Sequence, residues 1–190
     1  MLLESPQEVR MVASTPRPFV MGINYWPRRK GMYWWKEFDR EEVRAEFAEM
    51  SSLGARVARI FLMWEDFQPE PWVIDSGQLE KLGRVMDAAD EAGLSVMPTF
   101  FTGNMSGIFW LPRWALTGRA KSTPALQMVA GSYSGRQVRN LFEDPFVLRA
   151  MLFQVRVVVS TFATHPVLFG WDLANELDEV LNPDSPHGGW

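Results

Sequence analysis

Pro166-Val167-Leu168-Phe169-Gly170-Trp171-Asp172-Leu173-Ala174-Asn175-Glu176 is an apolar run of strand length that ends abruptly in an amide and a carboxylate. A buried parallel strand has this pattern when its carboxyl end delivers polar groups to a site. Strands also end in acids that are merely solvated, and the stretch alone does not decide between the two interpretations. The strand and helix patterns that lead up to it favour the first. Glu176 is therefore the first candidate for a functional residue.

The composition limits the classes of protein that the chain can represent. The 190 residues are 47% hydrophobic and carry a formal net charge of −4. One domain of this size can bury a sizeable core, and the charge offers no basic surface for nucleic acid. With no cysteines there is no thiolate metal site or cysteine nucleophile. The two histidines, His165 and His187, are too few for a typical histidine metal cluster. We expect neither a metal nor a cofactor.

The sequence carries no visible targeting segment. No run approaches the roughly 18 apolar residues of a membrane helix. The amino terminus, Met1-Leu2-Leu3-Glu4-Ser5-Pro6, lacks the basic and apolar regions of a signal peptide. We therefore expect a soluble chain that does not bind membranes and is either cytoplasmic or a processed secreted protein.

Strand-like and helix-like patterns alternate along the chain. Residues 1–18 contain three prolines and are expected to be a surface lead-in to a domain over residues 19–190. The strands are expected to begin near Phe19, Arg56, Leu94 and Val167. Asp39 with Glu42 predicts a helix start with a capping box, and Asp144 with Pro145 predicts another. Glycines close the first two helices, at Gly54 and Gly93.

This β-α-β-α-β-α-β order predicts an α/β fold with parallel strands and right-handed crossovers. A doubly wound sheet and the beginning of a (β/α)8 TIM barrel both fit. Gly22-Ile23-Asn24-Tyr25 lacks the second and third glycines of a phosphate-binding fingerprint, so we prefer the barrel. Because a whole barrel has about 250 residues, the chain is expected to hold its first four β/α units, a half-barrel.

The connection from Phe101 to Asp144 is far longer than the usual loop of about 2 to 6 residues in α/β units. Loops of that length are usually functional or contain small elements of their own. In a barrel the loops that follow strands form the active face. We therefore expect this connection to lie at the same end of the sheet as Glu176 and to supply Trp110 and Trp114 to a cleft.

Two charged residues fall inside predicted strands. Period-two alternation places Arg59 on one face with Val57 and Phe61, so it points into a core or a site and needs an acidic partner. The same alternation places Asp172 on the face of Glu176, and we expect Asp172 to be a buried structural acid.

The segment from Val167 to Glu176 resembles the fourth strand of retaining glycoside hydrolases of the GH-A clan, especially family 5 cellulases and mannanases, in which this strand ends in Asn-Glu. Further matches are Gly22-Ile23-Asn24-Tyr25, Val57-Ala58-Arg59-Ile60, Asp144-Pro145 and His165-Pro166. The resemblance covers roughly residues 19 to 180. It implies hydrolysis, with retention, of O-glycosyl bonds in a β-linked polysaccharide or oligosaccharide such as mannan or cellulose.

The resemblance also implies roles for individual residues. Glu176 would be the general acid/base, Asn175 would bind the sugar 2-hydroxyl, and Arg59 would hold the nucleophile's carboxylate ionised. Retaining chemistry needs a second carboxylate about 5 to 5.5 Å from the first. Apolar platforms for sugar rings could come from Trp26, Trp35, Trp64, Trp110 and Trp114. Each of these tryptophans could instead pack in the core or a loop.

Two features depart from the family pattern. Family 5 enzymes often carry a histidine near the end of strand three, and residues Thr99 to Asn104 include none. The family's nucleophile is a glutamate at the end of strand seven, and the predicted chain reaches only strand four. Glu65, Asp66 and Glu179 follow strands two and four and match no nucleophile motif. The chain alone is therefore expected to be inactive.

Two hypotheses follow. In the first, the chain is the acid/base half of a glycosidase and its partner is the missing C-terminal half-barrel. In the second, it is a non-catalytic half-barrel that binds carbohydrate or associates with a second copy, which would cover its open strand edges.

Overall fold

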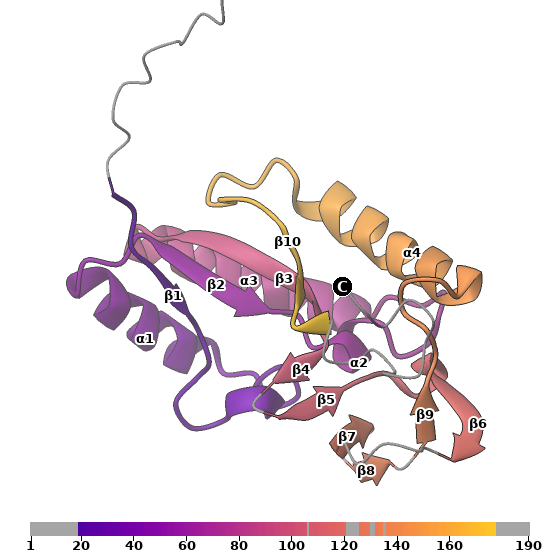
Figure 1. Cartoon of the computed structure of the whole chain (residues 1–190). Helices are drawn as coiled ribbons and strands as arrows, with labels where there is room; N and C mark the ends of the chain where they lie inside the picture. Colours follow the sequence, from indigo (N-terminus) through magenta and orange to yellow (C-terminus); the bar gives the residue numbers. More distant parts are fainter. Residues whose placement is uncertain (1–18, 106, 121–125, 130–131, 135, 178–190) are drawn as a thin grey trace, which may run out of the picture.

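The computed structural model describes residues 19–105, 107–120, 126–129, 132–134 and 136–177, and its main sheet has the strand order β1-β2-β3-β10 (Figure 1). The strands are β1 Gly22–Asn24, β2 Val57–Phe61, β3 Ser95–Thr102 and β10 Asp172–Asn175. All three neighbouring pairs are parallel. The predicted order and direction of the strands are confirmed. The lead-in expected over residues 1–18 lies outside the described residues, as does the end of the expected domain from residue 178.

Two strands begin later than the sequence pattern suggested. β1 begins at Gly22 rather than near Phe19, which is 91% exposed. β10 begins at Asp172 rather than Val167, because the chain touches β3 only through an isolated bridge between Val96 and Leu168 before it leaves the ladder. The apolar run therefore forms a bridge and then a short strand, not one continuous strand.

Three long helices connect the strands: α1 Arg40–Ser52, α3 Ser76–Ala92 and α4 Pro145–Phe162. Each begins after an aspartate whose side chain accepts backbone N–H bonds, namely Asp39, Asp75 and Asp144. Gly54 and Gly93 follow α1 and α3 with φ of 94° and 68°, the left-handed conformation that glycine adopts without strain. Both predicted helix ends are confirmed.

The capping box predicted at Asp39 forms only in part. The Asp39 carboxylate accepts from the backbone N–H of Glu42 at 3.3 Å. The Glu42 carboxylate, however, binds the Lys30 ammonium at 2.9 Å instead of reaching back to the helix start. An ion pair with the preceding loop has replaced the second half of the box.

Helix α4 is long and apolar enough, by length and composition alone, to cross a membrane. Core helices of globular domains commonly meet the same criterion. One side of α4 is buried, through Val147, Ala150, Gln154, Val158 and Phe162. Packing of this side against the rest of the domain accounts for part of the apolar composition, since Leu148 and Leu152 are 41% and 48% exposed.

The long connection after β3 contains several short elements of its own. They are β4 Asn104–Met105, β5 Ile108–Trp110, the 3-10 helix η2 Arg113–Ala115, β6 Leu116–Ala120, β7 Leu126–Val129, β8 Ser132–Ser134 and β9 Arg136–Val138. Figure 1 shows β4 next to the carboxyl end of β10, with the other short strands beyond it. The connection therefore lies at the end of the sheet that carries Asn175 and Glu176, as expected.

Gln68, a fully buried residue, links this end of the sheet to α4. It follows the short helix α2, Trp64–Phe67. Its side chain accepts from the indole N–H of Trp64 at 2.9 Å and donates to the carbonyls of Pro71 and Ala150 at 2.8 and 2.7 Å. A buried amide with its donors and acceptors paired stabilises the packing around it.

Gly103 follows β3 and lies against the segment that follows β10. A Cβ atom at this position would lie 2.8 Å from Leu177 Cδ2 and 3.1 Å from both Asn175 O and Leu177 Cα. Two of these are backbone atoms, which cannot swing aside as a side-chain end can. Glycine is therefore needed here for the backbones on either side of Glu176 to approach β3 this closely.

Replacing Gln68 by leucine should lower the free energy of unfolding by about 2 to 3 kcal/mol, because the buried Trp64 N–H and the carbonyls lose their partner. Gln154 is the matched control, because it is equally buried but its amide has no hydrogen-bond partner among the described residues. Gln154→Leu should leave stability unchanged or raise it. Denaturant unfolding measures both. Equal losses of unfolding free energy in the two variants would show that the hydrogen bonds of Gln68 do not stabilise the fold.

Gly103→Ala should destabilise the chain by about 1 to 3 kcal/mol, the usual effect of forcing atoms into a filled space. The backbone amide signals of residues 175–177 should shift in nuclear magnetic resonance spectra. Gly170 is the control, since a Cβ there meets nothing within 4 Å. Gly170→Ala should be neutral or stabilising by up to about 1 kcal/mol. A Gly103 variant as stable as the Gly170 variant, with unmoved signals, would refute the close-approach argument.

Candidate active site

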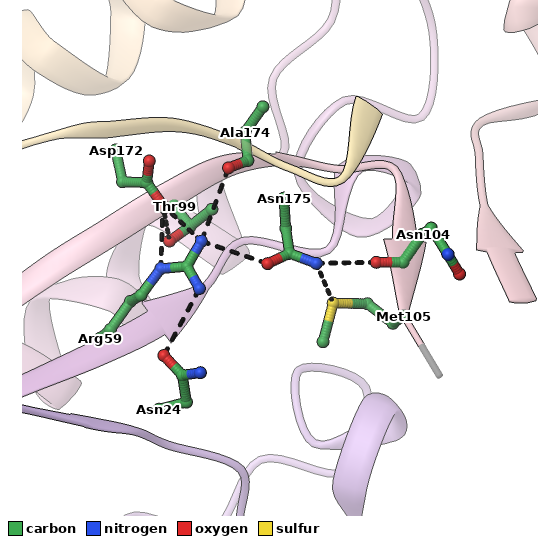
Figure 2. Close-up of polar contacts among 8 residues, drawn as sticks. All are labelled: Asn24, Arg59, Thr99, Asn104, Met105, Asp172, Ala174 and Asn175. Atoms are coloured by element: carbon green, nitrogen blue, oxygen red, sulfur yellow. Dashed lines mark hydrogen bonds and ion pairs between the residues drawn. The ribbon is translucent and has the colours of Figure 1, made fainter. Parts of the chain in front are cut away.

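The centre of the candidate site is an ion pair between Arg59 on β2 and Asp172 on β10. The guanidinium donates from Nε and Nη2 to Asp172 Oδ2 at 2.9 and 2.5 Å (Figure 2). The hydroxyl of Thr99 on β3, the strand between them, donates to the same oxygen at 2.8 Å. Arg59 thus has the acidic partner that its place in a strand required. Its guanidinium also lies 4.5 Å from the centre of the Phe61 ring.

Asp172 was expected to be a buried structural acid. Its side chain is 29% exposed and that of Arg59 is 20% exposed, so the pair is partly open to solvent. Asp172 is therefore less buried than expected, because it lies at the start of β10 on the edge of the described sheet.

Asn175 extends the network to the start of the long connection. Its side-chain oxygen accepts from Arg59 Nη2 at 3.2 Å, and its nitrogen donates to the carbonyl of Asn104 at 2.7 Å and to Met105 Sδ at 3.1 Å (Figure 2). Arg59 Nη1 reaches Asn24 on β1 at 3.4 Å. Polar groups from all four parallel strands therefore meet at one level, and they orient the Asn175 amide.

Glu176 follows β10 directly and is exposed. It has φ of 50° and is the one non-glycine residue with positive φ in the described part of the chain. Its carboxylate makes no hydrogen bond or ion pair with the described residues. Strained backbone of this kind persists only where surrounding contacts hold it, and it concentrates at functional sites. Asn175 supplies such contacts on its amino-terminal side, and Gly103 lies against Asn175 and Leu177 on both sides of it.

The five tryptophans considered as sugar platforms divide into two groups. Trp35 and Trp64 are fully buried, and their indole N–H groups donate to Phe61 O at 2.6 Å and to Gln68 Oε1 at 2.9 Å. They have no free face for a ligand in this structure, so we leave them out of the candidate site. Sequence spacing did not reveal this, since the loops that contain them fold back onto the core.

The remaining three tryptophans are half-buried. Trp26 stacks on Phe61 with ring centres 4.6 Å apart and planes 9° apart. Trp114 packs edge-on against Trp64 and donates its indole N–H to Gln68 O at 3.0 Å. Trp110 contacts Tyr33 edge-on at 5.5 Å. Trp26 is in the same stack as Arg59, so of the three it lies closest in the contact network to the ion pair.

Sequence reasoning did not identify Asn24, Thr99 and Met105 as members of this network. Their positions could have suggested them, because Asn24 and Thr99 lie near the carboxyl ends of predicted strands and Met105 follows the third predicted strand. The groups present are amides, a guanidinium and carboxylates. Within the described ranges no cluster of three or more histidine, cysteine, aspartate or glutamate side chains could hold a metal ion. The arrangement is suited to proton transfer by Glu176 beside a fixed hydrogen-bonding amide.

No model of a known protein family matches the sequence, and no curated protein matches it. Solved structures do match. A GH5_18 protein from Streptomyces cattleya in complex with GlcNAc superposes with a TM-score of 0.75 and 28% identity, over 90% of this chain and 37% of that one. A variant of the Streptomyces cattleya protein in complex with Manβ1-4GlcNAc gives 0.72 and 28%, over 87% and 36%.

A third match is an exo-β-1,4-mannosidase from Opitutaceae bacterium strain TAV5, with a TM-score of 0.67 and 34% identity over 83% of this chain and 25% of that one. The chain thus spans between a quarter and little more than a third of the length of these structures. Over that length it follows their alternation of strands and helices. The chain therefore corresponds in structure to part of the (β/α)8 barrel of family 5 glycoside hydrolases.

Proposed function

We propose that the chain supplies the general acid/base, Glu176, of a retaining glycoside hydrolase that cleaves β-linked mannosides, in oligosaccharides or in polysaccharides such as mannan. The observation that carries the proposal is the exposed Glu176 carboxylate directly after Asn175, whose amide is oriented by Arg59. The fold shared with family 5 structures supports the reaction class. The Manβ1-4GlcNAc complex and the exo-β-1,4-mannosidase favour a β-mannoside over cellulose.

In the proposed mechanism Glu176 has two successive tasks. As a carboxylic acid it protonates the leaving glycosidic oxygen while a second carboxylate attacks the anomeric carbon. As a carboxylate it then takes a proton from the water that hydrolyses the glycosyl-enzyme. Both N–H groups of the Asn175 amide already donate, to Asn104 O and Met105 Sδ. Its oxygen accepts from Arg59 Nη2 and has a second lone pair that could accept from the sugar 2-hydroxyl.

The nucleophile would come from another part of the barrel. Among the described residues, Asp172 is a poor candidate for the nucleophile that attacks the anomeric carbon. Its Oδ2 already accepts three hydrogen bonds, two from Arg59 and one from Thr99. Arg59 Nη1 makes only a long bond of 3.4 Å to Asn24. We propose that this nitrogen faces the nucleophile's carboxylate and keeps it ionised.

A non-catalytic half-barrel that binds carbohydrate or self-associates is the second candidate. It is favoured by exposed apolar side chains beside the β10 edge, Phe169 at 57% and Leu173 at 65%. Within the described chain β10 pairs only with β3, and β1 only with β2. A complementary half-barrel would cover both edges, and so would a second copy. Size measurement of the chain, alone and with a C-terminal half-barrel from a similar enzyme, distinguishes the two partners.

Glu176→Gln should lower the rate of β-1,4-mannotriose hydrolysis by about 10² to 10⁴, the usual contribution of a general acid. For a dinitrophenyl β-mannoside the fall in kcat/KM should be much smaller, because kcat/KM reports the first step and this leaving group needs no proton. Its kcat should still fall, because the second step needs Glu176 as a base. The assay uses the chain together with a C-terminal half-barrel that carries the nucleophile. The chain alone should show negligible turnover.

Glu80→Gln, at an exposed position on α3, is the control and should leave both rates unchanged. Mannotriose hydrolysis that survives in Glu176→Gln would exclude Glu176 as the acid/base. Turnover by the chain alone would show that it does not need a carboxylate from elsewhere.

Arg59→Lys should lower the free energy of unfolding by about 1 to 3 kcal/mol, because an ammonium cannot donate to Asp172 from two directions and to Asn175 as well. Arg56→Lys is the matched control, since Arg56 precedes the same strand, is exposed, and has a side chain that donates to the carbonyl of Ala55. It should change stability by less than about 0.5 kcal/mol. Denaturant unfolding that does not separate the two variants would argue against the network.

A further inference from the structure

Met105 is an apolar residue within the polar network around Arg59. It lies on β4 opposite Ile108 on β5, and its neighbour Asn104 lies opposite Phe109. Phe109 is 6% exposed and belongs to the hydrophobic core, so it anchors this pair of strands. Met105 is 9% exposed, yet it is not a member of the core cluster of the described residues. Its side chain is therefore buried against the site network, where Figure 2 shows it beside Asn175, rather than within the core.

The Asn175 amide has one favourable orientation between its protein partners. Its nitrogen donates to Asn104 O at 2.7 Å and to Met105 Sδ at 3.1 Å, and its oxygen accepts from Arg59 Nη2 at 3.2 Å (Figure 2). Turning the amide over would set its N–H groups against the guanidinium and its oxygen against the Asn104 carbonyl. Both arrangements are repulsive, so the oxygen faces Arg59 and both N–H groups face β4.

The Met105 sulfur takes the second of these N–H groups. A thioether is a weak acceptor and has no donor of its own. With Met105 in place both N–H groups are used, and the amide can offer a ligand only the remaining lone pair of its oxygen. An aliphatic residue of similar size would leave one N–H free, because the Asn104 carbonyl takes only the other. Residue 105 therefore decides whether the Asn175 amide is only an acceptor toward a ligand or also a donor.

We propose that Met105 is a positioning residue that determines specificity at carbon 2 of the sugar. Because its sulfur takes the second N–H of Asn175, the site selects a C2 substituent that donates a hydrogen bond, such as a hydroxyl, over one that only accepts. Met105 needs no contact with the sugar for this, since it acts through Asn175. The inference rests on the proposed function in that the sugar cleaved at Glu176 would present its C2 substituent to Asn175.

The contact itself is tested on the chain alone, by the two side-chain N–H signals of Asn175 in nuclear magnetic resonance spectra. Met105→Leu should move one of the two signals, because that proton loses its acceptor, and should keep the fold, since leucine and methionine have similar volumes. Met105→Gln supplies an oxygen acceptor and should move the same signal in the opposite direction. Met63→Leu is the matched control and should move neither signal, because Met63 is also buried but its sulfur accepts from Thr102 at 3.9 Å rather than from Asn175.

Specificity is tested by titrating the same chains with methyl β-mannoside and with its 2-deoxy-2-fluoro analogue, whose fluorine cannot donate. The parent should bind the hydroxyl compound about fivefold more tightly, the usual effect of one neutral hydrogen bond. In Met105→Leu this ratio of affinities should fall to about twofold or less, because the freed N–H can turn toward the fluorine. Met105→Gln and Met63→Leu should keep the parent's ratio.

The role of Met105 would be overturned by unmoved Asn175 signals in Met105→Leu, by a parent that binds neither mannoside or both equally, or by the same ratio of affinities in the parent and Met105→Leu. Unfolding curves show that each variant is folded. A ratio that depends on Met105, together with mannotriose hydrolysis that does not depend on Glu176, would keep this role and refute the acid/base. Glu176-dependent hydrolysis with a ratio that does not change in Met105→Leu would do the reverse.

Discussion

The ion pair between Arg59 and Asp172 is the interaction on which the arrangement of strand ends depends. Without a partner, a guanidinium inside a sheet would be strongly destabilising. The guanidinium bonds to Asn24 on β1 and to Asp172 and Asn175 on β10. Thr99 on β3 donates to Asp172, so the positions of these strand ends are coupled. A carboxylate 113 residues away in sequence completes the pair. Removing either charge would leave the other half-buried and unpaired, which costs more than the pair itself contributes.

The same network supports Glu176 without touching it. Asn175 is held by hydrogen bonds with Arg59, Asn104 and Met105. Gly103 has no side chain, so the backbone that follows β10 can pack directly against it. These contacts hold the backbone at the positive φ of Glu176, a conformation that a glutamate does not adopt freely. A catalytic carboxylate needs such fixed surroundings, because a displacement of about 1 Å is enough to lower the rate about 10²-fold.

The aromatic residues have two distinct uses in this fold. Trp35 and Trp64 are core residues that also satisfy their indole N–H groups, which large buried indoles require. Tyr33 and Trp110 remain at the surface and line a pocket with Lys36. Both groups come from loops with similar aromatic composition. Composition therefore indicated an aromatic-rich face, and the path of each loop decided which of its rings are buried and which are partly exposed.

Local patterns were sufficient for the helices, for the order of the strands and for Glu176 as the candidate acid. Asp144, Gly54 and Gly93 mark helix ends through bonds and backbone angles within a few residues, so the sequence by itself determined them. Only the tertiary structure decided that Asp172 is the partner of Arg59, that the chain leaves the ladder before Asp172, and which tryptophans are buried. It also brought Lys36 to Glu65 and Asp66. These features depend on contacts between segments that are distant in sequence, so local sequence patterns could not predict them.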